Sequence, residues 1–465
     1  MRLDARRNFR DYLAHYSTAC ARCALPFLSH PIVQRLSHTA LRFVALLGLA
    51  GCGAKADEPT LPINTPAPTP TLLAGTPKLP VLSIRTSDGA TIVSRDVYVN
   101  GTMSLADTTG APLSEGTLEI RGRGNTTWMF PKKPYRVKLT TSTALLGMPA
   151  NRHWVLLANY SDKTMVRNDL SFALSNMLGM AWTPRSRFVD LQMNGQYVGV
   201  YQLTEHVRVA PDRVNIPALK VTDTSAINIS GGYLLEVDER KGQTFCFNST
   251  MTSMVWCAAD PETLLDAGWE KQRAYITSYI ARTDSAIFGN TFADPATGYA
   301  AYIDVQSAID YYMVQEVVKN VDGNLRFGAS FHKPRGGKLF FGPVWDFDLA
   351  FGNVNYNTAD QTSGWYARSS LWFTRLFQDP VFRARFNARW TEMKQTGVVD
   401  SLQNLVLARA SYLSVVQVKN FERWPILGTY VWPNRVVTGS YDGEALALKG
   451  WLEDRVRWMD REISR

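Results

Sequence analysis

The strongest constraint on the fold is a change in hydrophobic periodicity near residue 262. Before it, short runs alternate apolar with polar residues, which is typical of half-buried strands: VLSIRT, VSRDVYVNG, TLEIRGRG, YRVKLT, WVLLANY and GGYLLEVDE. Beyond it, apolar residues recur every three or four positions, most clearly in 304–320 (DVQSAIDYYMVQEVVKN), as in amphipathic helices. A β-rich segment followed by a helix-rich one predicts an α+β protein.

Each half also contains elements of the other kind. Residues 163–180 have helical spacing, with Asp162 as a candidate cap and Gly179 at the end. FVDLQM and QYVGVYQL flank Asn194-Gly195, a dipeptide typical of a type I′ hairpin turn. In the second half, short strands are expected around Phe331 and at KLFFGPV, and a helix closes the chain.

The N-terminal residues 1–52 are typical of an export signal. Seven Arg and two Asp accompany a short apolar run, Phe43–Ala50, and a bilayer span needs about 20 apolar residues. Leu49-Ala50-Gly51-Cys52 resembles the bacterial lipobox, which would make Cys52 the lipidated first residue of the mature protein. The alternative is an ordinary secretory leader that is cleaved nearby.

A linker is expected after this signal. Residues 53–80 contain seven prolines together with Thr and Ala, which is typical of a disordered tether. The folded domain is therefore expected at 81–465. The whole pattern predicts an exported protein that a lipid anchors to the membrane of the cell envelope.

The charge and the cysteine content of the chain limit which partners and covalent cross-links can be expected. The chain carries 50 Lys and Arg against 41 Asp and Glu, but removal of 1–52 leaves 43 against 39, a net charge of +4. No basic block suggests a nucleic-acid surface, so no nucleic-acid partner is expected. Cys246 and Cys257, eleven residues apart in an exported chain, predict a disulfide, with two free thiols as the alternative. The motifs GxSxG, GxxxxGK[ST] and HExxH are absent from the sequence.

Two carboxylates stand in the apolar stretch GPVWDFDLAFGN. Burial of an unpaired carboxylate costs several kcal/mol, so Asp346 and Asp348 need a partner. In an extended segment both would point to the same side, where their repulsion favours a cation. Mg²⁺ on phosphates commonly takes one or two protein carboxylates, so a metal site is predicted here. The alternative is a pair of caps or of ion pairs.

Two further segments could face an anionic ligand. In RGRGNTTW, glycines 122 and 124 would permit positive φ and close backbone approach, as a loop over phosphates requires; an ordinary turn is the alternative. Lys138 alternates with apolar neighbours and could point into a cleft, or else into solvent. Lys132 and Lys133 lie in a Pro-flanked turn and are expected to be exposed.

A third carboxylate follows the long helix. Asp322, in Asn320-Val321-Asp322-Gly323, lies near the negative end of the helix dipole, where a carboxylate is unfavourable unless a metal or a hydroxyl substrate offsets it. A simple surface Asp-Gly turn is the alternative.

The order of these elements resembles an atypical protein-kinase-like bilobed fold with a β-rich N-lobe and a helix-rich C-lobe. Specific segments over roughly 80–465 resemble the CotH (spore coat protein H) family of atypical secreted protein kinases: RGRGNTTW–PKKPYRVKL, LLGM–WVLLANYSDKTMVRN, FVDLQMNGQYVGVYQLTE, RVNI–GGYLLEVDE, EVVKNVDGN and GKLFFGPVWDFDLAFGN. This resemblance implies transfer of the γ-phosphate of ATP, with Mg²⁺ or Mn²⁺, to Ser or Thr of protein substrates.

The resemblance also assigns residues. It implies that Asp322 is catalytic and orients the substrate hydroxyl or accepts its proton, and that Asp346 binds the metal with Asp348 as a second ligand. For the nucleotide, it implies Lys138 at the α and β phosphates, Glu205 near the adenine, and a covering loop of Arg121, Gly122, Arg123, Gly124 and Asn125. The alternative function is an invasin-like surface binding or scaffold protein that keeps the fold with weak turnover or none.

Overall fold

The structure is a computed structural model that describes residues 78–465, except 241 and 243. The expected signal peptide, Cys52 and residues 53–77 of the expected linker lie outside the described residues. Leu79 is buried, with 1% of its surface exposed, and the carbonyl of Pro80 accepts a hydrogen bond from Asp190 N at 2.9 Å. These two residues of the expected linker are therefore part of the folded unit.

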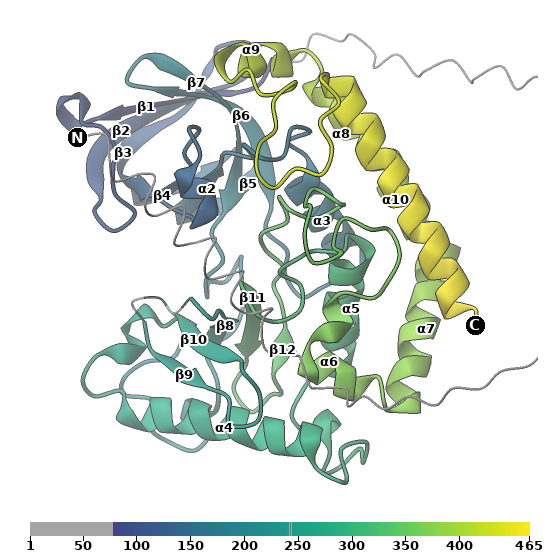
Figure 1. The fold of residues 1–465 in the computed structure, drawn as a ribbon. Coiled ribbons are helices and arrows are strands. Elements are labelled where there is room, and N and C mark those ends of the chain that lie inside the picture. The colour runs from purple at the N-terminus through teal and green to yellow at the C-terminus, as the bar shows by residue number, and fades with distance from the viewer. Residues whose placement is uncertain (1–77, 241, 243) are drawn as a thin grey trace, which may run out of the picture. The chain divides into compact units, whose positions relative to one another are not determined.

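Residues 81–205 contribute the strands of a closed seven-stranded barrel, in the order β1-β2-β3-β4-β5-β7-β6 (Figure 1). Neighbouring strands are antiparallel except β1 and β6, whose parallel pairing closes the ring. The strands are β1 (Val81–Thr86), β2 (Val99–Ala106), β3 (Pro112–Gly122), β4 (Tyr135–Leu145), β5 (Met148–Leu157), β6 (Ser186–Met193) and β7 (Gln196–Glu205).

The alternation of apolar and polar residues in the sequence explains which side chains fill the barrel interior. On β3, Leu118 and Ile120 are buried, and on β4 the buried residues are Val137 and Leu139. The expected strand at 93–101 is wrong in its first part, because residues 93–98 belong to the loop before β2 and Val93 is 77% exposed.

The hairpin between β6 and β7 is confirmed. Its turn residues have φ angles of 50° at Asn194 and 79° at Gly195, both in the left-handed region that a type I′ turn requires.

A second, five-stranded antiparallel sheet has the order β12-β11-β8-β10-β9. Its strands are β8 (Tyr233–Val237), β9 (Cys246–Asn248), β10 (Val255–Asp260), β11 (Ala329–Lys333) and β12 (Phe340–Phe341). The sequence did not predict β9 and β10, since β9 is too short to show a period. The expected disulfide is confirmed: Cys246 and Cys257 are directly opposite on these two strands and are bonded.

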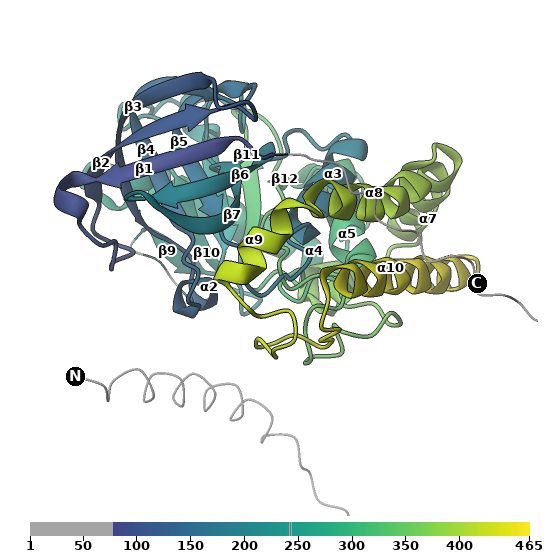
Figure 2. The same cartoon turned by 90° about the horizontal axis from the view of Figure 1, so that it is seen from above.

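The helices of the described residues are α2 (Thr126–Met129), α3 (Arg167–Met177), α4 (Glu270–Phe288), α5 (Val305–Val317), α6 (Leu371–Leu376), α7 (Pro380–Gln395), α8 (Val398–Leu413), α9 (Val416–Arg423) and α10 (Tyr441–Ile463). Every residue of α5 from Ala308 to Val317 is buried, so α5 is the central helix. In Figure 1, α7 and α10 lie beside it, and in Figure 2 α9 lies against β7.

The helices α5 and α10 confirm the expected ones at 304–320 and at the C-terminus. The expected helix at 163–180 is confirmed over Arg167–Met177, because residues 163–166 form a turn before it. None of the helices in the described residues is both long and apolar enough to cross a membrane.

Candidate active site

A cavity of about 670 Å³ lies where the barrel meets the second sheet. Its lining includes Arg123 and Gly124 after β3, Glu236 on β8, and three aspartates that follow α5: Asp322, Asp346 and Asp348. The structure thus brings together the expected glycine-rich loop and all three expected aspartates, although 198 residues separate Gly124 from Asp322.

The mixed composition of the stretch around Asp346 and Asp348 follows from the two environments that its side chains occupy. Val344 and Phe347 are fully buried in the main hydrophobic core, whereas both aspartates are half-buried and line the cavity. The extended conformation that would place both carboxylates on one side is not adopted, because Asp346 has a φ of 68° in the left-handed region. The turn, and not strand alternation, directs the two carboxylates.

The turn is held by polar side chains from α3 and from the segment that follows α5. Asn168 Oδ1 accepts a hydrogen bond from Phe347 N at 2.8 Å, and Asn320 Nδ2 donates to Asp346 O at 3.3 Å. Arg167 Nε donates to Ala350 O at 3.0 Å. Three successive parts of the loop therefore have fixed backbone positions.

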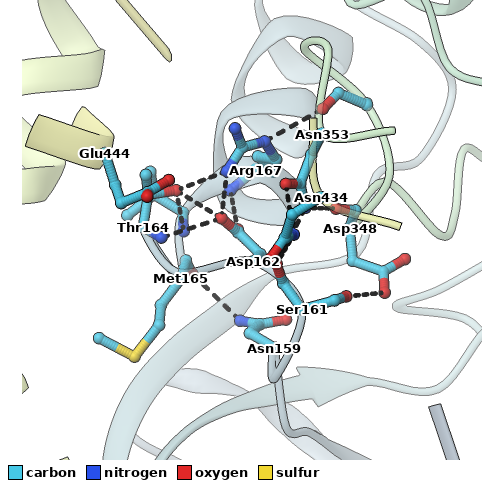
Figure 3. Close-up of polar contacts among 12 residues, drawn as sticks. Asn159, Ser161, Asp162, Thr164, Met165, Arg167, Asp348, Asn353, Asn434 and Glu444 are labelled. Atoms are coloured by element: carbon cyan, nitrogen blue, oxygen red, sulfur yellow. Dashed lines mark hydrogen bonds and ion pairs between the residues drawn. The ribbon is translucent and has the colours of Figure 1, made fainter. Parts of the chain in front are cut away.

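Asp348 has its own support (Figure 3). Ser161 Oγ donates to its carboxylate at 3.3 Å, and Asn353 Nδ2 donates to its carbonyl at 2.7 Å and to Ser161 O at 3.1 Å. Asn434 Nδ2 also donates to Ser161 O, at 2.7 Å. This bond to the Asp348 carboxylate comes from a side-chain hydroxyl and not from a backbone N–H of a helix.

A buried ion pair forms the base of this support. Asp162 is fully buried, accepts from Arg167 N at 2.9 Å, and pairs with the Arg167 guanidinium at 2.5 Å. Sequence reasoning assigned Asp162 only to a helix cap and gave Arg167 and Asn168 no role. The signal was present, because LLANYSDKTMVRN is unusually polar for a segment that enters a helix.

Burial, and then the charge of neighbouring carboxylates, raises the pKa of three acidic residues that line the cavity. Burial, and then the charge of Asp346, raises the pKa of Asp322 to about 7. Burial, Asp346, Asp162 and Asp322 together raise the pKa of Asp348 to about 8. Glu236, which the sequence did not single out, has its pKa raised to about 7 by burial and then by Asp238. A cation among these groups would offset their repulsion.

Positive charge faces these carboxylates from the glycine-rich loop. The Arg123 guanidinium lies over the Trp345 ring, 5.3 Å from its centroid. Burial lowers the pKa of Arg123, and the charges of Asp346, Asp348 and Glu236 act in the opposite direction. The cavity therefore has an acidic side and a basic side, a combination suited to a phosphate-bound cation.

Positions 122 and 124 of the loop require glycine for different reasons. Gly124 has a φ of 80°, which only glycine adopts without strain. Gly122 ends strand β3, and a Cβ there would clash with the Trp128 ring. Arg95 Nη1 holds the loop by donating to Gly124 O and Asn125 Oδ1, both at 2.8 Å.

Two expected nucleotide residues do not line this cavity. Lys138 pairs with Glu119 at 2.8 Å on the outside of the barrel, and its side chain is 33% exposed. Glu205 is fully buried and accepts from Arg185 Nε and Nη2 at 2.9 and 2.8 Å. The next residue, His206, lines the cavity instead, and burial lowers its pKa well below the usual value. Of the other loop residues, Arg121, Gly122 and Asn125 do line the cavity.

The donor set limits how a metal could bind. The described residues contain no group of three or more His, Cys, Asp or Glu side chains arranged to hold a metal ion. Asp346 and Asp348 fit the smaller demand of Mg²⁺ on a nucleotide, which takes one or two carboxylates and completes its shell with phosphate oxygens and water.

Comparison with known families identifies the family of the chain. The model of the family described as CotH kinase protein matches residues 120–459, and the chain belongs to this CotH kinase family. None of the curated proteins compared with the chain matches it.

Proposed function

We propose that the protein is an atypical protein kinase that transfers the γ-phosphate of ATP to Ser or Thr of protein substrates. In this proposal the barrel and the helical region after β8 are the N-lobe and C-lobe of a kinase-like bilobed fold. One observation carries the proposal: a single cavity joins the glycine-rich loop to Asp322, Asp346 and Asp348.

Each side chain then has a role in phosphoryl transfer. Asp322 accepts the proton of the acceptor hydroxyl, whose oxygen bonds to the γ-phosphorus while the bond to the bridging oxygen breaks and ADP leaves. Arg123 and the backbone of Gly124 bind phosphate oxygens. Asp346 and Asp348 would hold Mg²⁺ or Mn²⁺, which would neutralise developing charge on the phosphates.

The test is γ-phosphate transfer from ATP to a casein-like acceptor in the presence of Mg²⁺. We expect Asp346→Asn and Asp322→Asn to lower the rate by roughly a hundredfold or more, by analogy with loss of other charged transition-state groups. Asp400→Asn is the matched control, because Asp400 is exposed at the start of α8. Equal rates in the wild type and Asp346→Asn would refute the metal role.

A binding or scaffold protein without turnover is the second candidate. Two observations favour it: neither Lys138 nor Glu205 lines the cavity, so the nucleotide contacts expected from kinases are incomplete. Thermal unfolding separates the candidates. A kinase is stabilised by ATP with Mg²⁺, whereas no shift in the melting temperature at millimolar nucleotide would favour the scaffold.

We further propose that the protein is exported and anchored to the cell envelope through a lipid on Cys52. The support is the lipobox-like sequence before Cys52 and the Cys246–Cys257 disulfide, which suits an oxidising compartment. Metabolic labelling with a fatty-acid analogue should mark the wild type and leave Cys52→Ser unlabelled. Equal labelling of both would exclude the anchor.

A further inference from the structure

A second cavity, of about 680 Å³, shares no lining residue with the candidate active site. Its polar lining consists of Ser142, Asn151, Arg152, His153, Arg208 and Asn215, and we name it the outer basic cavity. His153 alternates on β5 with Trp154, whose ring is in the barrel core, so the imidazole points outward. Of the described residues that line this cavity, none is an Asp or a Glu.

The basic groups of this cavity have unused hydrogen-bonding capacity. The Arg208 backbone carbonyl accepts a hydrogen bond from Val214 N at 3.2 Å, but within the described chain its guanidinium makes no hydrogen bond or ion pair. The Arg152 guanidinium there uses only its Nε, which donates to Leu139 O at 2.9 Å. His153 Nδ1 is buried and has no partner among the described residues. A buried polar atom without a partner costs free energy, which a ligand with complementary groups would recover.

The electrostatics of His153 report the same excess of positive charge. Burial, followed by the charges of Arg208 and Arg136, lowers the pKa of His153 to about 3, while Glu262 acts in the opposite direction. Two carboxylates near Arg208 are already engaged: Glu262 accepts from Arg136 at 2.9 Å, and Asp260 accepts from Val209 N at 3.1 Å. The cavity therefore remains positively charged and His153 is neutral.

We propose that the outer basic cavity binds a phosphoryl group. Two guanidinium groups offer paired N–H donors that match phosphate oxygens, and the side chains of Ser142, Asn151 and Asn215 add neutral hydrogen-bonding groups. A single phosphate fills only a small part of 680 Å³, which leaves room for the residue that carries it.

The ligand is therefore either free inorganic phosphate or a phosphorylated Ser or Thr in a peptide. The peptide source rests on the proposed function, since phosphorylated Ser and Thr are the products of that reaction. The phosphoryl site itself does not depend on the proposed function.

The first experiment measures binding of inorganic phosphate and of a phosphoserine peptide to the full chain by calorimetry. Arg208→Gln should weaken both by roughly tenfold or more, because it removes a charge-assisted contact. Arg187→Gln, an exposed arginine on β6, should bind like the wild type. Tighter binding of the peptide than of phosphate identifies the peptide as the source, and equal binding identifies free phosphate.

Two results would overturn the proposal. One is unchanged phosphate binding in Arg208→Gln, and the other is binding that is lost only in Arg123→Gln, which would locate the anion in the candidate active site. Asp322→Asn separates this test from the proposed function, because it should lose transfer and keep phosphate binding.

His153 supplies a readout that does not depend on a folding defect in a variant. Proton NMR of the imidazole C–H in the wild type should show its pKa rise when phosphate is added, because the bound anion offsets the arginines. The resonance is assigned by its loss in His153→Gln. An unchanged titration at saturating phosphate would contradict binding in this cavity.

Discussion

At Lys132, the exposure predicted from neighbouring residues in the sequence is wrong. The Pro-flanked turn predicted an exposed lysine, but Lys132 is 2% exposed. Its Nζ donates to Val200 O at 2.5 Å and to Asn420 Oδ1 at 3.0 Å, and lies 4.8 Å from the centroid of the Tyr201 ring. Asn420 is 288 residues away in the sequence, so no local pattern could have predicted this contact.

This burial predicts a specific pH dependence. Burial lowers the pKa of Lys132 to about 7, below its value of about 10.4 in the unfolded chain. Between these values the unfolded state binds more protons, so the contribution of Lys132 to the free energy of unfolding rises with pH. Relative to Lys132→Met, the wild type should gain about 2 kcal/mol from pH 7 to pH 9 in urea unfolding.

In the difference between the wild type and Lys132→Met, the contributions of all other titrating groups to the free energy of unfolding cancel. Lys449→Met, a half-exposed lysine on α10, is the control and should show no such rise. A constant difference between wild type and Lys132→Met across this range would contradict a lowered pKa.

At the scale of elements, the loop that carries Asp346 and Asp348 depends on α3. Asn168→Ala would leave the buried Phe347 N–H without its acceptor, at a cost of about 1–3 kcal/mol. We expect that loss in chemical unfolding, together with weaker ATP–Mg²⁺ binding, since the turn would no longer be fixed. Asn176→Ala on the exposed side of the same helix should change neither. A variant with normal stability but weakened binding would limit the role of Asn168 to the proposed nucleotide site.

The β9–β10 hairpin makes a second prediction. The disulfide closes a loop whose ends are 11 residues apart, and removal of both thiols in Cys246→Ser/Cys257→Ser should cost about 2–3 kcal/mol. Thermal unfolding of oxidised, reduced and double-variant protein checks this. Reduced wild type should unfold like the variant, and a variant as stable as the oxidised protein would refute a stabilising role.

The elements that sequence predicted best are those with a sustained period. The strands β1, β3 and β4 and the helices α3, α5 and α10 were all predicted at nearly their observed positions, because one buried face sets each pattern. The strands β9 and β10 were not predicted, since segments of three and six residues are too short to show a clear alternation. The aspartates of the site were found from their unfavourable surroundings, whereas Ser161, Asn353 and Asn434 were missed because isolated polar residues have no period.

On the scale of the whole molecule, α10 is joined to the central helix by a buried ion pair. Arg455 and Glu316 have no exposed surface, and their side chains pair at 2.8 Å. Arg455 also donates to the carbonyls of Thr362 and Gly364 at 2.9 and 2.8 Å. One guanidinium thus connects the C-terminal helix, α5 and the segment before α6.

Arg455→Met should therefore destabilise the protein by about 3–5 kcal/mol, because it leaves the Glu316 carboxylate buried without its cation. The matched control is Arg457→Met on the same helix, whose side chain is 68% exposed and whose change should stay within about 0.5 kcal/mol. Denaturant midpoints measure both. Similar midpoints for the two variants would show that Glu316 has sufficient other partners.

The closure of the barrel has a mechanical consequence for an anchored protein. If Cys52 holds the chain to a membrane, a pull on the protein reaches the folded unit through the N-terminal end of β1. That strand is bonded along both edges, to β2 and in parallel to β6, so its detachment requires two rows of hydrogen bonds to break. A strand at the edge of an open sheet would be held by one row only, and the closed barrel thus fastens the tethered end of the folded unit on two sides.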